Sequence, residues 1–271
     1  MFCRYDICGS GVSALTKDQA LALLRGNDYH VPKYICIANA HTVTTAVHDR
    51  LFREATNNAW LCLPSGKPVS VLGNILYGAG SYERIFGPDF MAECLARSEE
   101  LDLTHFFYGA TTEVLEELEA KYALRLGSRI RGHLAPPFGT MQQRVIEAHF
   151  RRINEVRPKM IWVALGAPRQ EIFMYENLHR LAYGVMVGVG AAFAFETGSI
   201  RRAPLWMQEC GLQWLHRLVQ EPRLWRRYLV SNPLFVYYAG CAVLARRFAR
   251  TGRTTAATPG REQGEIEKPL R

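Results

Sequence analysis

Short apolar runs alternate with amphipathic stretches through most of the chain. The apolar runs are rich in β-branched and aromatic residues, and they predict strands at residues 34–38, 60–63, 104–108, 160–165 and 185–189. Amphipathic stretches at residues 111–126 and 141–156 predict helices between strands. This alternation is typical of a parallel sheet with helices on both faces. We therefore predict a Rossmann-like α/β domain over residues 1–202.

The segments that directly follow the predicted strands are rich in glycine and polar side chains. In parallel α/β sheets, ligands bind outside the carboxyl ends of the strands. The candidate binding segments are therefore residues 39–41, 64–67, 109, 166–171 and 188–195.

The strand pattern ends before residue 203, and the remainder predicts helices at residues 203–219, 222–230 and 233–248. Residues 201–250 hold nine arginines against Glu209 and Glu221. The apolar stretch 233–245 is shorter than the roughly 20 residues that cross a bilayer. Arginines and aromatic residues around it favour a helix at a membrane surface, although a helix packed on the main domain also fits. We predict a basic, membrane-associating helical appendage over residues 203–250 and a disordered tail over residues 251–271.

Composition and cysteine usage indicate a cytoplasmic protein. The first residues do not form a signal-peptide pattern, because Arg4 and Asp6 interrupt the apolar residues. The seven cysteines form no Cys-x-x-Cys pair and several lie in apolar runs. Buried free thiols are the favoured interpretation, over a zinc site or a disulfide framework.

The net charge of +8 predicts an acidic partner for the C-terminal region. Nucleic acid is one acidic partner, but the tryptophans and apolar residues beside the arginines favour lipid instead. We therefore expect the inner face of the plasma membrane as a partner and no nucleic acid. The sequence leaves open whether the chain forms homo-oligomers.

One motif resembles a nucleotide-binding loop without its usual context. Gly9, Gly11 and Ala14 fit the pattern G-x-G-x-x-A, which requires an acidic residue at the end of the second strand to hold a ribose. The second strand ends in Asn39, which is not acidic. An NAD enzyme is therefore disfavoured, and the glycines predict a turn. No cofactor is expected.

A metal-bound diphosphate is also disfavoured. Many nucleotide-sugar transferases hold a cation through an Asp-x-Asp pair, because hard cations require carboxylate oxygens. None of the six aspartates has another aspartate two positions away. We expect arginines and backbone amides to meet any diphosphate charge.

The C-terminal half carries several short elements that together point to one family. The patterns G-x-P-x-Q-E, G-V-G-x-x-F, R-A-P-x-W and G-L-x-W-x-x-R-L occur at residues 166–171, 188–193, 202–206 and 211–218. A stretch that opens with Glu-Pro and closes with Arg-Tyr follows at residues 221–228, and further elements lie upstream at residues 39–41, 64–68 and 84–89. In this order and spacing, these elements resemble those of the WecG/TagA/CpsF glycosyltransferases, glycosyltransferase family twenty-six.

The resemblance implies an inverting transfer from a UDP-sugar to an undecaprenyl-diphosphate-linked sugar, without an essential metal. By this resemblance Asn39 orients substrate, and Gln170 contacts the donor. Arginines of the C-terminal helices are implied to hold diphosphate. The full set of implied substrate-binding residues is Asn39, Gly66, Arg84, Gly166, Gln170, Glu171, Gly190, Arg217, Arg223 and Arg227.

The chain departs from the family pattern at the position of the implied catalytic base. Ser65 stands where the family usually has aspartate, and a serine hydroxyl cannot supply an alkoxide near neutral pH. His41 is our predicted base because an imidazole pKa of about 6.5 suits neutral pH, with Asp89 next and Glu171 also considered. Other departures are Ile37, Ala194 and Gln213 in place of threonine, aspartate and glutamate.

Two functions follow from these observations. The favoured one is hexosyl or N-acetylhexosaminyl transfer in the synthesis of a bacterial surface polysaccharide. The alternative is a family member that has lost its base and serves as a binding module in polysaccharide assembly. Transfer by the purified protein distinguishes the two, and the sequence does not identify the donor sugar.

Overall fold

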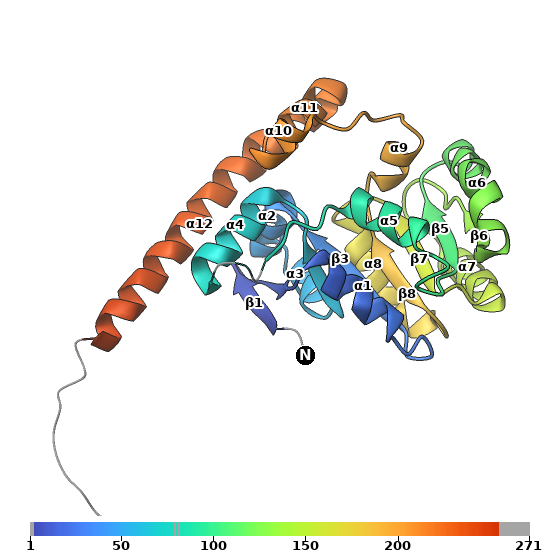
Figure 1. The fold of residues 1–271 in the computed structure, drawn as a ribbon, viewed down its shortest axis with the longest axis horizontal. Helices are drawn as coiled ribbons and strands as arrows, with labels where there is room; N and C mark the ends of the chain where they lie inside the picture. The colour runs from blue at the N-terminus through green and yellow to red at the C-terminus, as the bar shows by residue number, and fades with distance from the viewer. Residues whose placement is uncertain (1–2, 79, 81, 255–271) are drawn as a thin grey trace, which may run out of the picture.

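Six strands form one parallel sheet at the centre of the protein (Figure 1). The computed structural model describes residues 3–78, 80 and 82–254. The strand order is β4-β3-β8-β7-β5-β6, and each neighbouring pair is parallel. The strands are β3 (Lys33–Ala38), β4 (Leu61–Pro64), β5 (His105–Gly109), β6 (Ile130–Leu134), β7 (Met160–Ala164) and β8 (Val185–Gly188).

The predicted α/β fold with a parallel sheet is confirmed. The five strands predicted from apolar runs are present as β3, β4, β5, β7 and β8. The apolar pattern does not predict β6, because this edge strand is at most half buried and contains Gly132 and His133. A strand that is buried on neither face lacks the apolar run that reveals the other five.

Helices cover both faces of the sheet, and successive residues of each strand pack toward opposite faces. Ile35 and Ile37 of β3 contribute to one hydrophobic cluster, whereas Tyr34 and Cys36 contribute to the other. The first cluster is covered by α1 (Lys17–Arg25), α5 (Gly87–Ala96), α6 (Thr112–Leu126) and α9 (Ala192–Glu196). The second is covered by α2 (Ala40–His48), α4 (Lys67–Tyr77), α7 (Gln143–Val156) and α8 (Arg169–Asn177), with α3 (Arg50–Asn57) beside α8.

A separate antiparallel hairpin precedes the sheet. It consists of β1 (Cys3–Ile7) and β2 (Ser10–Ala14), joined through Cys8 and Gly9. Both connecting residues have positive φ, 54° and 86°, as a two-residue hairpin turn requires. The prediction that the glycines form a turn is confirmed for Gly9, whereas Gly11 lies in β2.

The appendage begins with two short helices, α10 (Leu205–Glu209) and α11 (Gln213–Gln220). The prediction of one helix over residues 203–219 is wrong. Gly211 adopts a φ of 75° between the two helices, a left-handed conformation that ends a helix and that glycine adopts without strain. The chain therefore turns at Gly211, between α10 and α11.

The final helix, α12 (Trp225–Thr254), is continuous through Pro233. The prediction of two helices, at residues 222–230 and 233–248, is therefore wrong. Proline leaves the carbonyl of Leu229 without its usual helical donor, but Leu229 is exposed and water can take that place. Phe235, which is buried, packs the following turn onto the domain.

Helix α12 runs along α2 and α4 (Figure 1). The hydroxyl of Tyr238 lies 2.9 Å from Nε2 of His48, and the guanidinium of Arg246 stacks 4.5 Å from the ring of Tyr77. The segment Pro222–Phe248 is the one described helix that is long and apolar enough to cross a membrane, by length and composition alone. Its length therefore does not exclude a span, contrary to the estimate from the short apolar stretch. Residues 251–254 extend α12, and residues 255–271 of the predicted tail lie outside the described part.

All seven cysteines are free thiols. Cys36, Cys62 and Cys94 are buried, as predicted for structural thiols, whereas Cys210 and Cys241 are exposed on the appendage. Burial raises the pKa of the Cys62 thiol to about 12, so this thiol stays protonated at neutral pH.

Candidate active site

Two neighbouring cavities lie at the carboxyl end of the sheet. The larger one, of about 380 Å³, lies between the α/β domain and the appendage. The smaller one, of about 120 Å³, lies directly at the ends of β3, β4, β7 and β8. The two cavities share part of their lining, namely Asn39, Ser65, Phe86, Phe195, Arg217 and Arg227. We treat them as one site.

The turns after β3 and β4 form one wall of the site. Asn39 caps α2, and its side-chain oxygen accepts a hydrogen bond of 3.1 Å from the backbone N–H of Thr42. Ser65 is buried, and its backbone N–H donates to the carbonyl of Ala38. A Cβ on Gly66 would come within 3.3 Å of Asn39, so glycine permits the two turns to approach.

Gln170 connects the turns after β7 and β8. Its side-chain oxygen accepts hydrogen bonds from the backbone N–H groups of Gly166, at 3.2 Å, and Gly190, at 3.0 Å. Its side-chain nitrogen donates to Oε1 of Glu171 at 2.9 Å. Gln170 is thus a buried connector rather than a residue on the helix surface.

The appendage brings two of its three singled-out arginines to the cavities. Arg217 and Arg227 line both, and Nε of Arg227 is buried with no hydrogen-bond partner among the described residues. The side chain of Arg223 is 82% exposed, pairs with Glu221 at 2.8 Å and does not line either cavity.

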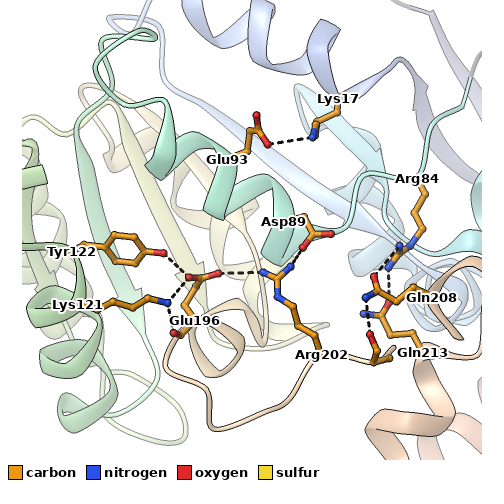
Figure 2. A network of polar contacts seen from close by, with 11 residues as sticks. Lys17, Arg84, Asp89, Glu93, Lys121, Tyr122, Glu196, Arg202, Gln208 and Gln213 are labelled. Carbon is orange, nitrogen blue, oxygen red and sulfur yellow. Dashed lines mark hydrogen bonds and ion pairs between the residues drawn. The ribbon is translucent and has the colours of Figure 1, made fainter. Parts of the chain in front are cut away.

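Arg84 ties the α/β domain to the appendage, as Figure 2 shows. Its Nη2 donates to the side-chain oxygen of Gln213 at 2.6 Å, and its Nη1 lies 3.5 Å from that of Gln208. Both partners are uncharged amides, so neither neutralises the guanidinium. Arg84 therefore retains its positive charge toward the larger cavity, which it lines.

The three proposed base candidates occupy different surroundings. His41 lines the larger cavity, where burial and the positive charge of Arg227 lower its imidazole pKa to about 4. Asp89 lines neither cavity and pairs with Arg202. Glu171 is buried beside the smaller cavity, where burial raises its carboxyl pKa to about 7.

A polar network beside the site holds the linker between α9 and α10, residues 197–204 (Figure 2). Arg202 pairs with Asp89 of α5 and with Glu196 of α9, the latter at 3.4 Å. Glu196 also accepts hydrogen bonds from Lys121, at 2.9 Å, and from the hydroxyl of Tyr122. One buried carboxylate thus joins α6, α9 and the linker.

Replacing Glu196 with alanine is expected to lower the free energy of unfolding by about 1–3 kcal/mol, because the buried hydroxyl of Tyr122 loses its acceptor. Burial raises the Glu196 pKa, but hydrogen bonds from Tyr122 and Lys121 outweigh burial and lower it overall. The loss of unfolding free energy in the variant should therefore be complete above pH about 4.3, the unfolded-state pKa of glutamate, and should become smaller as the pH falls below that value. Chemical denaturation at several pH values measures the effect.

The control for this substitution is Glu117→Ala, an exposed site on the same helix as Lys121. A surface change of this kind should stay within about 0.5 kcal/mol. Equal destabilisation by the two variants would contradict the role of Glu196 in the network.

The aromatic walls of the larger cavity are missed by sequence reasoning. They include Phe86, Phe195, Trp214 and Tyr228. Lys67, the first residue of α4, adds a positive charge to the lining. Each lies inside a motif that the sequence analysis singles out for its polar residues. Attention to the aromatic positions of those motifs would have identified them.

The lining of the larger cavity is positive. Lys67, Arg84, Arg217 and Arg227 line it, and none of its described lining residues is aspartate or glutamate. Arg217 forms a 2.8 Å ion pair with Glu221, which lies outside the lining. Low-dielectric walls strengthen such a field, so the site favours anionic ligands. Among the described residues, no group of three or more His, Cys, Asp or Glu side chains is placed to hold a metal ion.

Comparison with known proteins identifies relatives of this chain. The family described as "Glycosyl transferase WecG/TagA/CpsF family" matches residues 5–251. An N-acetylglucosaminyldiphosphoundecaprenol N-acetyl-beta-D-mannosaminyltransferase of Bacillus subtilis (strain 168) is 29% identical over 203 residues, which cover 74% of this chain and 77% of the relative.

A protein of the same description from Bacillus spizizenii (strain ATCC 23059 / NRRL B-14472 / W23) is 29% identical over 210 residues. That match covers 77% of this chain and 79% of the relative. The family match includes both the α/β domain and most of the appendage. The chain therefore belongs to the WecG/TagA/CpsF family and is a glycosyltransferase.

Proposed function

We propose that this glycosyltransferase moves a hexose or N-acetylhexosamine, or its uronic acid, from a UDP-sugar to an undecaprenyl-diphosphate-linked sugar, with inversion. The observation that carries the proposal is the cationic cavity between the α/β domain and the appendage. Donor and acceptor each bear a diphosphate, so a site that accommodates both requires several fixed positive charges. The relatives' names describe a lipid-diphosphate acceptor of this kind.

The arrangement of the cavities supports separate places for the two substrates. The smaller cavity, at the strand ends, suits the donor, in keeping with ligand binding in parallel sheets. The larger cavity reaches Phe235 and Val236 of α12, and these apolar residues suit the lipid side of the acceptor. Arg217 and Arg227 line both cavities and lie where the diphosphates would approach each other.

We further propose that the protein lies on the inner face of the plasma membrane through its appendage. Exposed apolar side chains recur along α12 and include Trp225, Leu229, Val230, Tyr237, Leu244 and Phe248. Contacts of α12 with His48 and Tyr77 of the α/β domain favour a helix that lies along the surface rather than one that crosses it. Surface-polysaccharide synthesis is the pathway class that uses such lipid-linked sugars.

The test is transfer by the purified full-length protein in detergent or vesicles. UDP-N-acetylmannosamine, its uronic acid, UDP-N-acetylglucosamine and UDP-glucose are each supplied with undecaprenyl-diphosphate-N-acetylglucosamine. We expect one donor to give an extended lipid-linked product, detected by mass spectrometry, and transfer that persists with EDTA.

The result also separates the enzyme from a binding module. Ser65, in place of the family's usual aspartate, is the observation that favours an inactive member. Donor binding without transfer or donor hydrolysis, across the whole donor set, would contradict the enzymatic proposal and support that alternative.

A further inference from the structure

Glu171 is a buried carboxyl group whose surroundings are unusual for a structural residue. It lies in the first turn of α8, directly after the β7 turn, and its side chain is almost fully buried. It lines the smaller cavity together with Asn39, Ser65 and Arg227. Glu171 therefore lines the same cavity as Ser65, the residue that stands where the family usually has aspartate.

One oxygen of Glu171 has a hydrogen-bond partner and the other has none among the described residues. Oε1 accepts the 2.9 Å hydrogen bond from Gln170, whose own oxygen is held by two backbone N–H groups. Oε2 is buried and has no hydrogen-bond partner among the described residues. A buried polar atom without a partner is costly, so a substrate hydroxyl is the natural donor to Oε2.

The charged and titratable groups around Glu171 leave it able to gain and lose a proton near neutral pH. Burial raises its pKa to about 7, although the Gln170 hydrogen bond and the charge of Arg227 oppose this rise. The thiols of Cys36 in β3 and Cys62 in β4 also face it, and burial raises both thiol pKa values, so they remain neutral. His41, with a pKa of about 4, is a weaker base at the same pH.

We propose that Glu171, rather than His41 or Ser65, is the general base of the transfer reaction, with Gln170 as its positioning residue. The attacking hydroxyl oxygen of the acceptor bonds to the anomeric carbon while the bond from that carbon to the β-phosphate oxygen breaks. UDP leaves with the electron pair of the broken bond. The hydroxyl proton moves to Oε2 of Glu171. This inference rests on the proposed transferase function and adds the group that removes the proton.

The test is Glu171→Gln in the full chain, assayed with the donor and lipid-linked acceptor that the wild type uses. Loss of a general base typically lowers turnover about 10²- to 10⁴-fold, so we expect kcat to fall at least a hundredfold with donor KM changed little. In the wild type, kcat should rise with pH through about 7, since the base must be deprotonated, and this rise should vanish in the variant. The matched control, Glu176→Gln on an exposed position of α8, should retain both turnover and pH profile.

Two further variants separate a chemical role from a structural one. Ser65→Asp in the Glu171→Gln background places a carboxylate on the same cavity wall and should recover at least tenfold of the lost turnover. Glu171→Asp keeps the carboxylate but shortens the side chain by one methylene. We therefore expect kcat to fall about tenfold or more, while the rise of kcat with pH remains. Glu171→Asp tests the inference even if Glu171→Gln fails to fold.

Four results would overturn the inference. Wild-type turnover in Glu171→Gln, or wild-type turnover in Glu171→Asp, removes Glu171 from the reaction while leaving the transferase proposal intact. An unchanged pH profile in Glu171→Gln, with turnover merely reduced, assigns it a structural role. Absence of transfer by the wild type itself contradicts the proposed function, and with it this inference.

Discussion

Replacing Arg227 with alanine is expected to lower kcat about a hundredfold or more while donor KM changes by a few-fold. Charge that develops on a leaving diphosphate in a dry site is stabilised strongly by a fixed cation, and removal of one such group typically costs this much. Arg227 fits this role because it lines both cavities and its Nε has no described partner. Steady-state kinetics at saturating acceptor measure the change.

Arg223→Ala is the matched control for this prediction. Arg223 belongs to the same motif, but its side chain is exposed and pairs with Glu221. Its loss should change kcat by less than about threefold, in contrast to the effect of removing a cavity cation. Equal losses in the two variants, or a wild-type reaction that stops in EDTA, would contradict leaving-group stabilisation by Arg227.

A triple variant with Leu229, Tyr237 and Leu244 changed to glutamate should release the protein from vesicles that contain anionic lipid. Burial of each apolar side chain contributes about 1.5–3 kcal/mol, so partitioning should fall more than a hundredfold. All three side chains are exposed on α12, so the change leaves the core intact. Vesicle sedimentation at low and high salt, with DNA binding as a parallel measurement, provides the readout.

The control is Leu124→Glu, an exposed apolar position on α6, a helix that lies far from α12 in Figure 1. It should sediment with vesicles as the wild type does. The triple variant should also lose transfer to the lipid-linked acceptor but retain transfer to a short-chain, water-soluble analogue. Unchanged sedimentation of the triple variant would show that membrane contact does not depend on these three side chains of α12.

The fold was largely predictable because its central strands are buried on both faces. Burial on both faces produces the continuous apolar runs of β3, β5 and β7, which stand out without any structural information. The edge strand β6 and the hairpin strand β1 have exposed positions, so their patterns resemble those of loops. Tertiary contacts also decided the continuity of α12, since Phe235 packs the turn that follows Pro233.

The site was predictable where strand ends and motifs coincide, as at Asn39, Ser65 and Gln170. Sequence did not reveal which charged residues already have partners. Asp89 lies in a matched motif, yet its ion pair with Arg202 places it in the linker network. Arg223 likewise pairs with Glu221 outside the cavities.

The choice of base shows the same dependence on surroundings. An unperturbed imidazole has the better pKa for a base at neutral pH, which favours His41 in the sequence. Burial and the nearby Arg227 charge make this imidazole less basic, whereas burial makes the Glu171 carboxyl more basic. Neither shift can be predicted from residue type, because both depend on how the chain packs around the group.

The appendage carries two exposed cysteines that thiol reagents can modify. Cys36, Cys62 and Cys94 are shielded inside the α/β domain, whereas Cys210 and Cys241 are open to solvent on the appendage. A maleimide dye should therefore modify the appendage thiols of the native protein and spare the three buried ones. With Cys3 and Cys8 replaced by serine, such a dye would report the polarity around the appendage directly, without any engineered cysteine.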